Sequence, residues 1–172
     1  MKIITRLLAL ALLLTALITI TTLPALAQTH DWTSIGGTGR IAPAGAFKMT
    51  YTGPTLKFNS FSTGDIVARY PVTNTYGSGT SLTPPWTTLW ATYLDNSASG
   101  SVTARLYEVE KCTGAETLIC TITSSNSGSS QCSSCSFNSS TFDFGNNSYW
   151  VEVTLNRSVT SAAEELYSLA VN

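Results

Sequence analysis

Apolar and polar residues alternate with a period of two along much of the chain. The segment 148–156 is the clearest case, with one set of residues apolar and the intervening set polar or amphipathic: Tyr149, Val151, Val153 and Leu155 against Trp150, Glu152, Thr154 and Asn156. This alternation is typical of a β-strand with one face in a core and the other toward solvent. Residues 166–171 repeat the pattern. No apolar pattern of helical period extends beyond about two turns, so the chain is predicted to be all-β.

Eight segments rich in β-branched and aromatic residues are predicted to be strands: 46–51, 55–61, 65–73, 87–94, 101–111, 117–123, 148–156 and 166–171. Gly, Pro, Asn and Ser separate them at intervals of roughly ten residues. About eight short strands with polar turns indicate an antiparallel β-sandwich. Because the Cys-Trp-Cys spacing of immunoglobulin domains is absent, a jelly-roll-like arrangement is favoured. The one helical candidate, 161–167, is short.

The first 27 residues have the pattern of a secretory signal peptide. Lys2 and Arg6 precede an apolar segment at 7–20, and Ala25-Leu26-Ala27 forms a small-x-small cleavage site. An uncleaved anchor is the alternative, since 7–26 could just span a bilayer. We expect cleavage after Ala27, which leaves a single domain over residues 28–172. We therefore expect the protein to be secreted, either extracellular or periplasmic, with no contact to the membrane after cleavage.

Charge and histidine content narrow the possible functions. Lys and Arg total 9 and Asp and Glu total 10. Two of the basic residues lie in the leader, which leaves seven basic against ten acidic residues, a net charge of −3. This balance argues against a nucleic acid as partner, because nucleic-acid binding needs clustered positive charge. The single histidine, His30, offers little basis for a Ser-His-Asp or Cys-His mechanism, so we expect no enzyme.

Carboxylates give no better catalytic candidate. Glu108 and Glu110 are two residues apart on a predicted strand and share one face, which is compatible with a general acid and base. The same spacing is usual on any solvated strand face, and this interpretation is favoured. The sequence therefore yields no catalytic residue.

Four cysteines fall within a short stretch of the chain: Cys112, Cys120, Cys132 and Cys135. An even number in a secreted chain predicts two disulfides. A zinc site and a redox-active Cys-x-x-Cys are alternatives. Three of these cysteines border or lie within a serine-rich segment, 124–140, which is predicted to be a long loop stapled by disulfides. The favoured pairing is nested, Cys120 with Cys132 and Cys112 with Cys135, and the other pairings stay open.

Two turns resemble incomplete calcium loops. Residues 95–100 and 143–147 each contain an Asp followed by Asn or Ser and a glycine. Each offers a single carboxylate and lacks the bidentate Glu of a calcium-binding loop. A plain turn is favoured for both, so we expect neither a metal nor a cofactor.

Tryptophans supply the candidate binding site. Trp86 and Trp90 would share one face of the strand predicted to start after Pro85, and Trp150 falls on a polar face. Indole rings on polar sheet faces can stack on sugar rings while amide and carboxylate groups bind the hydroxyls. The predicted ligand-binding residues are Trp86, Trp90, Trp150, Glu152 and Asn156. The alternative is that these rings cover a sheet edge, pack beneath a loop or form a subunit contact.

Two hypotheses follow for the function. The first is a secreted, non-enzymatic β-sandwich recognition module that binds a polysaccharide or a cell-surface glycan through its aromatic face. The alternative is a structural or adhesive extracellular subunit, in which the same rings and strand edges make protein–protein contacts.

Overall fold

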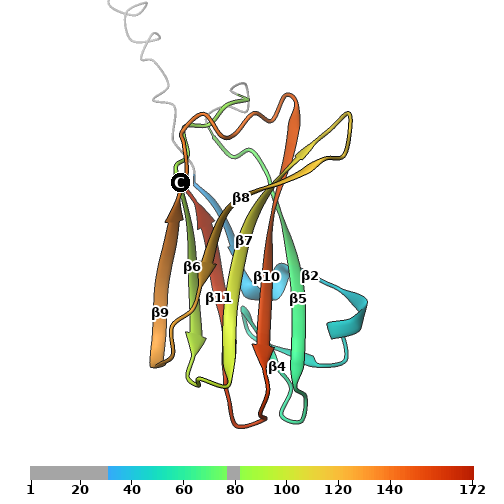
Figure 1. Ribbon diagram of the computed structural model, residues 1–172, viewed down its shortest axis with the longest axis vertical. Helices are drawn as coiled ribbons and strands as arrows, with labels where there is room; N and C mark the ends of the chain where they lie inside the picture. Colours follow the sequence, from blue (N-terminus) through green and yellow to red (C-terminus); the bar gives the residue numbers. More distant parts are fainter. Residues whose placement is uncertain (1–30, 77–81) are drawn as a thin grey trace, which may run out of the picture.

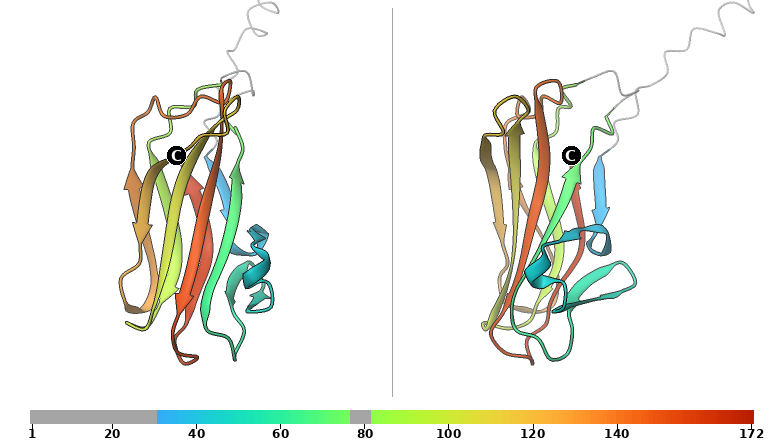
Figure 2. Two further views of the ribbon diagram at one scale, coloured as in Figure 1. Left: turned by 45° about the vertical axis from the view of Figure 1, so that its right-hand side comes forward. Right: turned by 90° about the vertical axis from the view of Figure 1, so that its right-hand side faces the viewer.

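A computed structural model of the protein describes residues 31–76 and 82–172 (Figure 1). The predicted signal peptide and His30 lie outside these residues. Eleven strands form two antiparallel sheets. The strands run along the long axis of the molecule, and the loops gather at its two ends (Figure 2). The prediction of an all-β antiparallel sandwich is confirmed.

Sheet 1 has six strands: β1 (Trp32–Ile35), β3 (Met49–Thr52), β4 (Thr55–Phe58), β6 (Thr88–Asp95), β9 (Ser127–Ser136) and β11 (Glu164–Val171). Their order is β3-β4-β11-β6-β9, and β1 pairs with the later part of β11, beyond the residues that pair with β4. Sheet 2 has the order β2-β5-β10-β7-β8, with these bounds: β2 (Arg40–Ile41), β5 (Gly64–Val72), β7 (Gly100–Glu110), β8 (Glu116–Thr123) and β10 (Asn147–Arg157). Most connections from β5 onward cross between the sheets.

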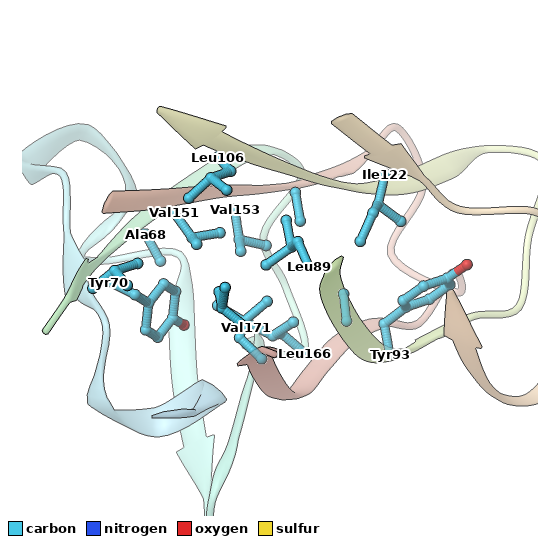
Figure 3. Packing of buried hydrophobic residues seen from close by; sticks show 14 of the residues in the cluster. Ala68, Tyr70, Leu89, Tyr93, Leu106, Ile122, Val151, Val153, Leu166 and Val171 are labelled. Atoms are coloured by element: carbon cyan, nitrogen blue, oxygen red, sulfur yellow. The ribbon is translucent and has the colours of Figure 1, made fainter. Parts of the chain in front are cut away.

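The core lies between the two sheets and is built from the inward residues of each strand. Figure 3 shows side chains from both sheets pointing toward one another, among them Leu106 and Val151 from sheet 2 and Leu89 and Leu166 from sheet 1. The apolar residues of the alternating segment 148–156 are all buried, as predicted. Burial of this continuous apolar layer is the main force holding the sheets together.

Each of the eight predicted strands is present, with ends shifted by a few residues. Three further strands were not predicted. β1 and β2 are short, and β9 consists of the serine-rich segment, which pairs along β6 instead of forming a loop. Serine has low strand propensity, so the pairing with β6 overrides the local preference. The helical candidate 161–167 is wrong, because β11 begins within it at Glu164.

Two short 3₁₀ helices, η1 (Gly36–Thr38) and η2 (Pro43–Gly45), follow β1 and β2. Gly36 brings η1 against β11: a Cβ atom at this position would lie 2.0 Å from the carbonyl oxygen of Leu166. The hydroxyl of Tyr70 donates a hydrogen bond to the Gly36 carbonyl at 2.6 Å. Only glycine therefore permits the close approach that sets β1 and η1 beside β11.

Within residues 31–76 and 82–172, no helix is long and apolar enough to cross a bilayer.

Candidate functional site

The structure separates the predicted site residues. Trp86 is 3% exposed, and its ring packs edge-on against Phe142 at a centroid distance of 5.2 Å. The expectation that Trp86 shares an exposed face with Trp90 is wrong. β6 begins at Thr88, so the period-two alternation of the strand does not extend back to Trp86. Trp86 is a core residue.

Trp90 lies on the outer face of sheet 1. Its neighbours in the strand, Leu89 and Ala91, are buried, whereas Trp90 is 37% exposed. The indole nitrogen Nε1 donates a hydrogen bond to Oδ1 of Asn172 at 3.1 Å. The residues opposite it on the adjacent strands, Ala170 and Ser134, are small. Small flanking side chains leave the ring accessible while the hydrogen bond holds its orientation.

A hollow of about 410 Å³ lies on the same sheet, and Ala170, the partner of Trp90 on β11, is one of the residues that line it. Thr33 on β1 pairs with Ala170 on β11, and Ala170 pairs with Trp90 on β6. The hollow and Trp90 are therefore connected by one row of paired residues across the three strands. Its lining is uncharged and combines hydroxyl groups with apolar side chains: Thr33, Ser34, Ile35, Thr38, Ser168, Leu169 and Ala170. We call Trp90 and this hollow the Trp90 surface. Sequence reasoning found Trp90 but missed the hollow, since β1 was not predicted.

Trp150 lies on the outer face of sheet 2, the opposite side of the sandwich. Its ring stacks on that of Tyr107, with centroids 4.6 Å apart and planes 15° from parallel. The guanidinium of Arg69 lies 4.7 Å from the indole centroid. Arg69 and Tyr107 come from β5 and β7, which flank β10 on its two sides, so they cover opposite faces of the indole. Neither face of Trp150 is free for stacking on a sugar.

Glu152 and Asn156 follow Trp150 on the same outer face. The carboxylate of Glu152 accepts from Arg69 at 3.2 Å and lies 4.0 Å from Arg105. The side-chain amide of Asn156 donates to the carboxylate of Asp65. These side chains belong to cross-strand pairs of sheet 2. The structure thus brings Trp150, Glu152 and Asn156 to one surface and places Trp90 on the other.

The cysteines depart from the predicted pairing. Cys120 is bonded to Cys135, whereas Cys112 and Cys132 are free and exposed. The nested pairing is wrong because Cys132 lies opposite Thr92 on the outer face of sheet 1, while Cys135 lies opposite the buried Leu89. Only Cys135 can reach across to Cys120 on the edge strand of sheet 2. The disulfide therefore links β8, at the edge of sheet 2, to β9, at the edge of sheet 1.

The carboxylates that the sequence singled out make local hydrogen bonds. Glu108 accepts from the Tyr149 hydroxyl at 3.1 Å, and Glu110 accepts from the Thr113 hydroxyl at 2.7 Å. Asp143 accepts from the Asn146 side chain and the Gly145 amide, and these bonds lower the pKa of its carboxyl. Among the residues described, no group of three or more His, Cys, Asp or Glu is placed to hold a metal ion.

No protein-family model and no curated protein matches the chain. Among solved structures, it is similar to a xylan-binding module, CBM15, at 15% identity and a TM-score of 0.49, over 83% of this chain and 95% of that one. It is also similar to TmCBM61 in complex with β-1,4-galactotriose, at 7% identity and a TM-score of 0.43, over 83% and 87% of the two chains. An exo-β-1,3-galactanase from Phanerochaete chrysosporium is 11% identical, with a TM-score of 0.39, over 84% of this chain and 30% of that chain. The sandwich itself is established by the strand pairing described above.

Proposed function

We propose that this protein is a non-catalytic carbohydrate-binding module, secreted as its leader predicts, whose binding site is the Trp90 surface. The observation that carries the proposal is the exposed, hydrogen-bonded indole of Trp90 on a sheet that also carries a hydroxyl-lined hollow, with Ala170 between them. Trp86, Trp150, Glu152 and Asn156 are not part of the proposed site, because the first is buried and the others lie on the opposite sheet.

The chemistry of the Trp90 surface matches that of a sugar. A pyranose has an apolar face of C–H groups that can lie on an indole ring, and a rim of hydroxyls that exchange hydrogen bonds with Ser and Thr. Thr33, Ser34 and Ser168, which carry hydroxyl groups, line the hollow. A volume of about 410 Å³ is within the range of small-molecule sites and is large enough for a few sugar units.

The charge of the surface favours a neutral glycan. None of the residues that line the hollow is charged, and Trp90 is flanked by Ala170 and Ser134. A uronic acid or a sulfate group would lose hydration at this surface without gaining a cationic partner. We therefore expect binding to neutral polysaccharides, with modest affinity of about 10–1000 μM because a single ring supplies the stacking.

Replacing Trp90 with alanine is expected to weaken glycan binding by about 5- to 30-fold, since a stacked aromatic contributes roughly 1–2 kcal/mol. A glycan array identifies the neutral ligand, and titration calorimetry then compares the two proteins. The melting temperature should change little, because the ring is more than one-third exposed.

Trp150→Ala is the matched control, as it removes the same side chain from the opposite sheet. We expect it to leave glycan affinity unchanged. A Trp90→Ala variant that binds as well as the parent would contradict the proposal. So would sedimentation that shows a dimer broken by Trp90→Ala, since this result would favour the adhesive-subunit hypothesis.

A further inference from the structure

Three arginines lie in one row across the outer face of sheet 2. Arg40 on β2 pairs with Arg69 on β5. Glu152 on β10 pairs with Arg69 on one side and with Arg105 on β7 on the other. The strands lie side by side in the order β2-β5-β10-β7 (Figure 1), and the other arginine of the described residues, Arg157, is buried. We call these four paired residues the arginine row; it carries three positive charges against one negative charge.

Arg40 is an exposed cation whose charge is not compensated. Among residues 31–76 and 82–172, its guanidinium forms no ion pair and no hydrogen bond. The carboxylate of the row, that of Glu152, is bonded to Arg69 at 3.2 Å and lies 4.0 Å from Arg105. Like charges directly opposite each other on an antiparallel pair are destabilising. The pair formed by Arg40 and Arg69 therefore has a positive charge that an anionic ligand would neutralise.

Arg69 is held in position before any ligand binds. Its Nε and Nη2 atoms both donate to Oε2 of Glu152 at 3.2 Å, and its guanidinium lies 4.7 Å from the centroid of the Trp150 ring. The side chain of Arg69 is nevertheless 61% exposed. A guanidinium has five N–H donors, so further donors remain for a second carboxylate. Because the group is already ordered, less conformational entropy is lost on binding.

A hollow of about 330 Å³ lies at the same end of the row. Its lining combines the two arginines with apolar residues: Arg40, Ile41, Ala42, Pro43 and Arg69. The chain leaves β2 here, and the amide of Ala42 donates to the carbonyl of Val67 at 2.9 Å, which fixes this wall of the hollow. The volume is within the range of small-molecule sites. Apolar walls suit the C–H groups of a sugar ring, and paired arginines suit a carboxylate on that ring.

We propose that the arginine row binds the carboxylates of a uronate polysaccharide, with one uronic acid unit seated in the hollow between Arg40 and Arg69. Guanidinium and carboxylate groups form charge-assisted hydrogen bonds with matching planar geometry. A chain with a carboxylate on each sugar also reaches Arg105 farther along the row. Because such a chain is stiff, it loses less conformational entropy than a flexible acidic peptide. This second site adds an acidic class of ligand, on the sheet opposite the Trp90 surface.

Titration calorimetry with oligogalacturonate at low ionic strength tests the proposal. We expect binding that weakens about fivefold or more when NaCl is raised from about 20 to about 200 mM, since the charges of the row are exposed to solvent. The methyl ester of the same oligosaccharide, which keeps the sugar chain but loses the charges, should not bind. Polyglutamate, which keeps the charges but lacks the sugar rings, should bind about tenfold more weakly or less.

Arg40→Gln is expected to weaken oligogalacturonate binding about fivefold or more, because one charge-assisted contact is lost. Lys57→Gln is the matched control: it removes one positive charge from β4 in sheet 1, outside the arginine row, and should retain the affinity of the parent within about twofold. Arg40→Glu should abolish binding while the melting temperature stays the same or rises, because an acid then lies opposite Arg69.

The proposal is overturned if the parent protein does not bind oligogalacturonate, or if the methyl ester or polyglutamate binds as tightly. It is also overturned if Arg40→Gln binds as the parent does, or if Lys57→Gln loses as much affinity as Arg40→Gln. Neutral glycan binding at the Trp90 surface is tested separately, and Arg40→Gln should leave it unchanged.

Discussion

Replacement of Trp86 with alanine is expected to lower the free energy of unfolding by about 3–5 kcal/mol. The indole is 3% exposed and packs edge-on against Phe142 and Phe144, at centroid distances of 5.2 and 6.1 Å. Removing it leaves a cavity among aromatic rings that cannot fully collapse, so both the transfer energy and the packing contacts are lost. Chemical denaturation followed by circular dichroism measures the change.

Trp90→Ala provides the contrast, because it removes the same side chain from an exposed position. We expect it to change the free energy of unfolding by about 0.5 kcal/mol or less. Trp86→Ala should therefore lower the free energy of unfolding about six times as much as Trp90→Ala, or more. For glycan binding we expect the opposite order, with the larger loss of affinity in Trp90→Ala. Equal losses of stability would show that Trp90 is also a core residue and would remove it from the proposed site.

Replacing Cys120 and Cys135 together with serine is expected to lower the free energy of unfolding by about 3 kcal/mol. The bond closes a segment with a sequence separation of 15, and breaking it restores conformational freedom to the unfolded chain. It also joins β8, at the edge of sheet 2, to β9, at the edge of sheet 1. Since β9 is rich in serine and buries little apolar surface, we expect it to separate from β6 first. Hydrogen exchange of the β9 amides would report this.

Cys112→Ser combined with Cys132→Ser is the matched control. Both side chains are exposed and free, so the double variant should be as stable as the parent. Alkylation of the unfolded, unreduced protein should label two cysteines per chain. Labelling of none would show two disulfides and would contradict the pairing described here.

The two outer faces of the sandwich differ in how their side chains are engaged. On sheet 2, planar groups stack in the order Arg69, Trp150 and Tyr107, and Glu152 lies between Arg69 and Arg105. On sheet 1, Trp90 stands among small and hydroxylated residues. An aromatic ring already covered on both faces adds to the stability of its sheet, whereas an uncovered ring is available to a ligand.

The positions of most strands could be predicted from the local sequence. The alternation from Tyr149 to Asn156 identified both β10 and its buried face, since side chains of a strand point to opposite sides whatever its partners are. The same reasoning correctly separated Leu89 and Ala91 from Trp90. It failed for β9, because a run of serines has no apolar face and becomes a strand only by pairing with β6. It failed for Trp86 because the residue lies just outside its strand.

The sheet to which each strand belongs, and the strands that it pairs with, were decided only by the tertiary structure. Period-two alternation says that Trp90 and Trp150 both point outward, but not that β6 and β10 belong to different sheets and hence to opposite faces. Likewise, Asp95 lies opposite Glu164, although Glu164 comes from a strand much later in the chain. Cys135 reaches Cys120 because the edges of two sheets meet. Alternation is a property of neighbouring residues, whereas sheet order and pairing come from burying all the apolar faces at once.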